Sequence, residues 1–153
     1  MKITFVCRDN LTRSLTAEFC LRDYLQKNKI NDVEVDSVAL EIKDYEKIYD
    51  YHLQIMKKLG IDSFFKPRKK ADAEHLKRFG VVIAMDTYIQ ERLFDEFGVN
   101  SLLFNEVYCG KKTSVKIDWQ KDEEGIKKEL ENFVYYLKES MPSFLENLRN
   151  RIK

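Results

Sequence analysis

The residues most suited to chemistry lie near the N-terminus, where a short apolar run ends in a cysteine and an arginine follows six positions later. The run Ile3-Thr4-Phe5-Val6 leads into Cys7, and Arg13 is followed at once by Ser14. This order predicts a strand, a loop and then a helix. Successive backbone N–H groups in such a loop can form an anion-binding concavity, and the helix N-terminus behind it adds a positive dipole.

The same spacing predicts a phosphate-binding loop that carries its own nucleophile. Arg13 can hold a phosphate group through two parallel hydrogen bonds. The positive surroundings favour the thiolate form of Cys7, which is the nucleophilic form of a cysteine. Between and beside these two residues, the loop would contribute Arg8, Asp9, Asn10, Leu11, Thr12 and Ser14 to phosphate binding.

The overall composition restricts what the chain can bind. A chain of 153 residues with 44% hydrophobic residues is expected to form one domain, residues 1–153, with a sizeable core. The net charge of +1 gives no bulk attraction to nucleic acid or to an anionic membrane surface. Neither is therefore expected as a partner, and any preference for anions must be local.

The cysteines and histidines indicate neither a disulfide framework nor a metal site. Cys7, Cys20 and Cys109 are an odd number at irregular spacing, and His52 and His75 stand apart from each other. No cofactor and no metal are therefore expected. The N-terminus lacks the apolar run of a signal peptide, so a reducing cytoplasm is the expected location.

Apolar periodicity and turn residues predict alternating strands and helices. Strands are expected at 2–6, 33–37, 81–85 and 101–104, and helices at 14–28, 44–59, 72–79, 87–97 and 123–149, the last kinked by Pro142. We interpret Lys66, Arg68, Lys69 and Lys70 as a solvated basic loop, and 108–121 as a polar segment. The pattern predicts an α/β domain: a four-stranded parallel sheet with helices on both faces and the phosphate-binding loop between the first strand and first helix. Cys7 would then lie at the carboxyl edge of the sheet, where such folds bind ligands.

Several motifs in order resemble the low-molecular-weight protein tyrosine phosphatases over most of the chain. The family's C-x5-R-S loop after the first strand matches Cys7, Arg13 and Ser14, and its loop asparagine matches Asn10. The second strand resembles the family's strand that ends in an exposed serine. The middle section is similar in order and spacing at Leu59-Gly60-Ile61-Asp62, Arg78-Phe79 and Ile83-Ala84-Met85-Asp86.

The resemblance implies a phosphomonoesterase that needs no metal. Cys7 would attack phosphorus to form a phosphocysteine, while Arg13 and the loop amides stabilise the phosphoryl oxygens. Ser14 would stabilise the departing thiolate, and Asn10 would brace the loop. The implied substrate is a phosphorylated protein or a small aryl phosphate, and the implied state is a monomer or weak dimer.

The family's general acid comes from an acidic loop before the last helix. Asp118 is the candidate here, and Asp122 is the alternative. Trp119 and Leu11 are expected to line the substrate pocket, where a flat apolar wall suits a phenyl ring.

Four positions depart from the family pattern. Asp9 replaces a loop glycine, which raises the questions of backbone strain and of repulsion of a phosphate. Thr12 replaces the second loop cysteine, so a protective disulfide with Cys7 cannot form. Trp119 follows the candidate acid in place of proline. Ser37-Val38-Ala39 and the charged stretch 41–47 replace the family's turn after the second strand.

These departures leave other functions open. A catalytically weak or inactive relative would bind phosphorylated ligands as a recognition module. An arsenate reductase would need further cysteines to relay a disulfide, a role for which Cys20 and Cys109 are poorly placed. A phosphoarginine phosphatase resembles a branch with threonine after the loop asparagine, whereas Leu11 is similar to the tyrosine branch.

Overall fold

A parallel sheet of four strands forms the centre of the protein, with the order β2-β1-β3-β4. The computed structural model describes residues 1–42, 50–62 and 66–153. The strands are β1 (Lys2–Cys7), β2 (Glu34–Ala39), β3 (Val81–Ala84) and β4 (Leu102–Leu103). Because β1 pairs with β2 on one side and β3 on the other, Cys7 ends the strand at the middle of the sheet. The predicted α/β class and four parallel strands are confirmed, and the strand ends differ from the predicted ones by at most two residues.

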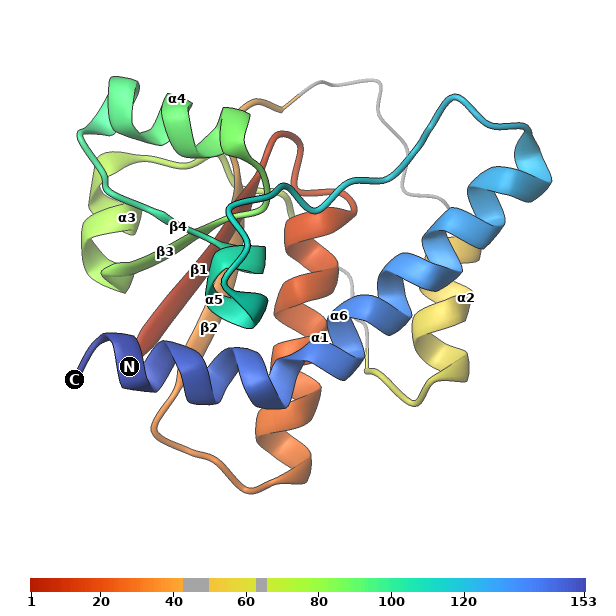
Figure 1. Ribbon diagram of the computed structural model, residues 1–153, viewed down its shortest axis with the longest axis horizontal. Coiled ribbons are helices and arrows are strands. Elements are labelled where there is room, and N and C mark those ends of the chain that lie inside the picture. The colour runs from red at the N-terminus through yellow and green to blue at the C-terminus, as the bar shows by residue number, and fades with distance from the viewer. Residues whose placement is uncertain (43–49, 63–65) are drawn as a thin grey trace.

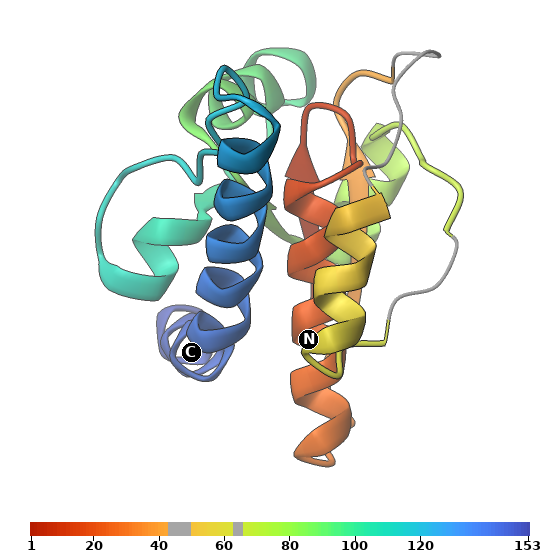
Figure 2. The ribbon, with the colours of Figure 1, turned by 90° about the vertical axis from the view of Figure 1, so that its right-hand side faces the viewer.

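Helices cover both faces of this sheet, as predicted (Figure 1). On one face, α3 (Ala73–Phe79) and α4 (Thr87–Phe97) pack in a core with Val6, Val38 and Val82. On the other face, α1 (Arg13–Lys27), α5 (Phe104–Cys109) and α6 (Glu123–Arg151) enclose the larger core, and α2 (Asp50–Lys58) packs against α6 (Figure 2). The predicted helix 44–59 is confirmed over 50–58, and its first residues lie outside the described ranges.

The sequence did not reveal α5. The predicted strand 101–104 is shorter in the structure, and a helix begins at Phe104, the residue assigned to the strand's end. Phe104 stacks on Phe144 of α6 with ring centroids 4.8 Å apart. Gly110 ends the helix with φ 76°, a conformation that glycine adopts without strain. Six residues are too few for a clear helical period, so tertiary packing decides the conformation here.

The longest helix, α6, contains Pro142 within its span. Figure 1 shows that the helix axis changes direction between its two ends. A proline inside a helix removes one backbone hydrogen bond and crowds the preceding turn, which accounts for the predicted bend. The bend lets α6 follow α1 first and α5 afterwards.

Candidate active site

The sulfur of Cys7 receives polar contacts from its own loop. The Cys7 Sγ lies 3.0 Å from Ser14 Oγ, and the backbone N–H of Asn10 donates to it over 3.2 Å. The side chain of Asn10 donates through Nδ2 to Ser14 Oγ at 2.7 Å and to Ser37 Oγ at 2.9 Å. Asn10, Ser14 and Ser37 are all buried, so these bonds fix the loop against β2. Donors aimed at the sulfur stabilise negative charge there.

The backbone of the loop turns at Asn10, which has φ 54°. Asparagine tolerates this left-handed conformation better than most residues do. Asp9, the replacement for the family's glycine, lies outside the positive-φ region, so the substitution brings no strain of that kind. Its carboxylate accepts from Arg8 Nε and Nη2, each at 3.2 Å, and the neighbouring cation offsets its negative charge.

Arg13 is held by two groups that lie far away in the sequence. Its Nη1 donates to Asp86 Oδ2 at 2.5 Å and to the Val115 carbonyl at 3.2 Å. Asp86 also caps α4, because its Oδ1 accepts from the Ile89 N–H at 2.7 Å. One carboxylate thus starts a helix and orients the guanidinium. The sequence offered Asp86 only as part of a family motif, although an Asp directly before a helix is a recognisable capping signal.

Ser37 corrects an expectation from the sequence. The resemblance implied an exposed serine at the end of the second strand, but Ser37 is fully buried within β2. Its hydroxyl contacts Asn10 on one side and Glu18 Oε2 of α1 on the other. Glu18 is itself fully buried and forms an ion pair with Arg22 at 2.9 Å.

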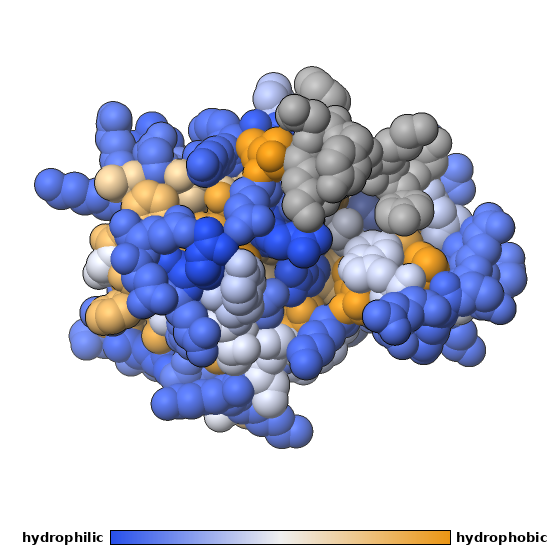
Figure 3. Space-filling model, turned by 90° about the horizontal axis from the view of Figure 1, so that it is seen from above, coloured by the Kyte–Doolittle hydropathy of each residue, from blue (hydrophilic) through white to orange (hydrophobic). Residues whose placement is uncertain are grey.

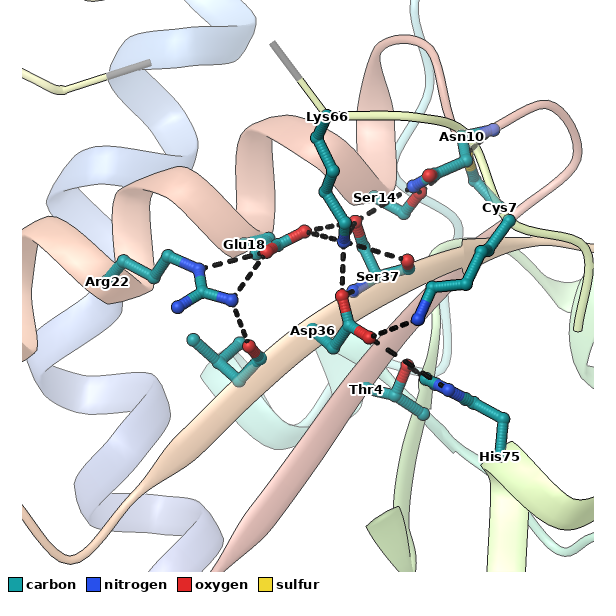
Figure 4. A network of polar contacts seen from close by, with 12 residues as sticks. Thr4, Cys7, Asn10, Ser14, Glu18, Arg22, Asp36, Ser37, Lys66 and His75 are labelled. Atoms are coloured by element: carbon teal, nitrogen blue, oxygen red, sulfur yellow. Dashed lines mark hydrogen bonds and ion pairs between the residues drawn. The ribbon is translucent and has the colours of Figure 1, made fainter. Parts of the chain in front are cut away.

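The basic segment is also less solvated than predicted. Lys66 is buried except for 12% of its side chain, and its Nζ contacts Glu18 Oε2 at 2.6 Å and Asp36 Oδ1 (Figure 4). The solvated-loop interpretation is therefore wrong for Lys66, whereas Lys69 and Lys70 are exposed. A run of charges looks the same in sequence whether it faces water or buried carboxylates.

The remaining predicted residues lie around the loop at differing depths. Leu11 and Thr12 are half-buried, and Thr12 precedes α1 without capping it through its side chain. Asp118 and Trp119 are exposed in a turn before α6, and Asp118 Oδ1 accepts from the Gln120 N–H at 3.0 Å. No contact described for Asp118 joins it to the loop within the part of the chain that the structure covers. Its role as the acid stays a prediction.

The loop and its partners gather at the edge of the sheet where the strands end. Figure 3 looks onto this edge and shows a mainly hydrophilic surface with small, separate apolar areas.

Asp122, the alternative acid, caps α6 by accepting from the Gly125 N–H at 2.8 Å. Cys20 is buried in α1, and burial raises the pKa of its thiol well above the usual range. Cys109 donates to the Asn105 carbonyl within α5.

Comparison with known proteins identifies the class to which this fold and loop belong. The model of the low molecular weight phosphotyrosine protein phosphatases matches residues 2–153. The chain belongs to this family, which makes it a member of a phosphatase family. No curated protein sequence matches the chain significantly.

Solved structures share the fold at low sequence identity. A YwlE mutant from Bacillus subtilis is 18% identical, with TM-score 0.83, covering 97% of this chain and 99% of that one. The low molecular weight protein tyrosine phosphatase from T. tengcongensis is 20% identical, with TM-score 0.82 and coverage of 95% and 98%. The YwlE arginine phosphatase from Geobacillus stearothermophilus is 18% identical, with TM-score 0.79 and coverage of 97% and 93%. Among the described residues, no helix is long and apolar enough to span a membrane.

Proposed function

We propose that this chain hydrolyses phosphomonoesters through a phosphocysteine on Cys7, with an aryl phosphate of the phosphotyrosine type as substrate. One observation carries the proposal: the hydrogen-bonded Cys7 sulfur and the Arg13 guanidinium stand at the two ends of one tight loop. In the first step the sulfur attacks phosphorus, an S–P bond forms and the P–O ester bond breaks. Arg13 and the loop N–H groups stabilise the phosphoryl oxygens during the transfer.

Asp118 is proposed to give a proton to the leaving oxygen in this step. In the second step it takes a proton from water, which attacks phosphorus, breaks the S–P bond and restores the thiolate. The Val115 carbonyl accepts from Arg13, and Val115 N–H donates to the Met85 carbonyl, which ties this segment to the site. Asp118 follows three residues later, and three extended residues span about 10 Å. That reach supports the assignment.

Steady-state hydrolysis of p-nitrophenyl phosphate and phenyl phosphate, across pH and with chelator present, tests the proposal. Cys7→Ser should abolish turnover of both substrates. Asp118→Asn should slow phenyl phosphate by about a hundredfold but p-nitrophenyl phosphate much less, because nitrophenolate leaves without a proton. Asp122→Asn is the matched control, since asparagine also caps a helix. Undiminished turnover by Cys7→Ser would refute the covalent mechanism, and equal losses in both aspartate variants would refute the choice of acid.

A recognition module is the second candidate function. The Asp118 carboxylate contacts its own turn, which would leave the departing oxygen without a proton donor and so favour binding without turnover. A protein that binds vanadate at Cys7 but leaves both substrates intact would establish this reading.

Two further chemistries can be separated by substrate. Fold similarity to YwlE proteins does not distinguish phosphotyrosine from phosphoarginine, and Leu11 favours the aryl substrate by resemblance. Turnover of a phosphoarginine peptide above that of a phosphotyrosine peptide would reverse this choice. The buried Cys20 and its raised pKa disfavour the thiol relay that an arsenate reductase requires.

A further inference from the structure

A buried cluster of charges lies where α1 and β2 meet, close to the loop (Figure 4). Glu18 of α1 and Asp36 of β2 both contact the Lys66 ammonium, which also donates to the Ser37 carbonyl at 3.1 Å (Figure 4). Arg22 holds the other oxygen of Glu18 at 2.9 Å. Lys69 Nζ lies 3.6 Å and His75 Nδ1 3.9 Å from Asp36 Oδ2, and His75 Nε2 contacts Thr4 Oγ1 at 3.0 Å.

This cluster is joined to the nucleophile by an unbroken chain of hydrogen bonds. It runs from Glu18 to the Ser37 hydroxyl, from there to the Asn10 side-chain amide, then to the Ser14 hydroxyl and the Cys7 sulfur. Every member is buried. In such a chain the donor in one hydrogen bond determines the donor in the next, because each hydroxyl has only one hydrogen to donate.

The charge on Glu18 sets that direction. An ionised carboxylate only accepts, so the Ser37 hydroxyl must donate to Glu18. The Ser37 oxygen then accepts from Asn10, whose two amide hydrogens go to Ser37 and Ser14. The Ser14 hydroxyl hydrogen is then free to point at the Cys7 sulfur, beside the Asn10 backbone N–H that also donates to it, and it stabilises the thiolate as attacker and as leaving group.

We propose that Lys66 is a positioning residue for this reaction: its ammonium keeps Glu18 an acceptor and so points the Ser14 hydroxyl at Cys7. The inference rests on the proposed function in taking Cys7 as the nucleophile. Burial alone raises the pKa of Asp36, but the hydrogen bond and charge of Lys66 outweigh it, and the pKa lies below its ordinary value. The Lys66 ammonium thus favours the charged form of the Asp36 carboxyl.

Removal of the Lys66 ammonium should reverse the direction of the hydrogen bonds between Glu18 and Cys7. Glu18 and Asp36 would lose the cation that they share and keep only Arg22 and Lys69 at their outer oxygens, so protonation of one carboxyl would relieve the repulsion between the two inner oxygens. A protonated Glu18 can donate to Ser37, which turns the Ser37 hydrogen towards Asn10. The Asn10 amide then rotates to accept, and the Ser14 hydrogen points away from Cys7.

The test compares Lys66→Met, Lys66→Arg and, as a matched exposed control, Lys70→Met. The first readout is the pH titration of thiolate ultraviolet absorbance, taken as the difference between each protein and the same protein with Cys7→Ser. This difference cancels Cys20, Cys109 and the tyrosines, and it requires no turnover. Lys66→Met should move the titration midpoint upward by about one pH unit, a tenfold loss of thiolate preference. The titration midpoints of Lys66→Arg and Lys70→Met should stay near that of the unmodified protein.

A second readout separates positioning from general damage to the loop. In Lys66→Met the inhibition constant for inorganic phosphate should stay within about twofold, because Arg13 and the loop amides are untouched, while kcat falls. Parallel losses in phosphate affinity and kcat, or an unmoved midpoint, would overturn the proposal. If Lys66→Met does not fold, Glu18→Gln replaces it, because this variant leaves Lys66 paired with Asp36. Its titration midpoint should also move upward. If the unmodified protein does not turn over, the proposed function fails, yet the titration still decides this inference.

Discussion

The buried histidine of α2 makes the stability of this protein depend on pH in a calculable way. His52 is 1% exposed, its Nε2 contacts Thr16 Oγ1 at 2.8 Å, and its ring stacks on Phe133. Burial lowers the pKa of His52 from 6.5 to about 4. Between pH 6.5 and about pH 4 the unfolded chain binds a proton at His52 but the folded protein does not, so the free energy of unfolding falls as pH decreases. The free energy of unfolding changes by about 1.4 kcal/mol for each pH unit, which gives about 3 kcal/mol over the whole range.

Urea unfolding followed by circular dichroism, at steps from about pH 7 to pH 4, measures this effect. His52→Gln keeps a hydrogen-bonding group for Thr16 but cannot take up the proton, so its curve isolates the histidine. Burial also lowers the pKa of His75, which adds to the slope of both proteins equally. Asp36, with its lowered pKa, loses its contribution only below its unfolded value of 3.8. The stability difference between the two proteins should shrink by about 3 kcal/mol across the window, and a constant difference would refute the reasoning.

Substitutions at three positions test the loop and the core. Asp86→Asn should lower kcat/KM about tenfold by releasing Arg13, with the melting temperature preserved because asparagine still caps α4; an unchanged kcat/KM would contradict this role. Asn10→Ala should cost about 2 kcal/mol of stability in urea, since it removes buried hydrogen bonds at a positive φ, and Asn10→Gly should recover only the conformational part; an Asn10→Gly protein as stable as the unmodified one would show that the bonds contribute nothing. Phe144→Ala should cost about 4 kcal/mol because its ring packs between Phe104 and Phe5, and a loss below about 1 kcal/mol would show that the core refills the space.

The order of strands and helices was readable from the sequence because it depends on local patterns. Buried runs such as 81–84 are uninterrupted, as expected for a strand covered on both faces, and Gly98 ends α4 in the left-handed conformation. The short helix α5 was not predicted because it depends on tertiary contacts rather than on a local pattern. Its six residues have no clear period of their own, and contacts with α6 hold them.

The sequence by itself determined the loop: the spacing of Cys7 and Arg13 between a strand and a helix depends only on neighbouring residues. Only the tertiary structure decided what holds that loop in place. Arg13 meets Asp86 across 73 positions, and Lys66 meets Glu18 across 48. The partners of a charged side chain depend on which elements the sheet brings together, and local periodicity carries no information about them. For that reason Lys66 looked like one member of a solvated basic run until α1 and β2 supplied the carboxylates around it.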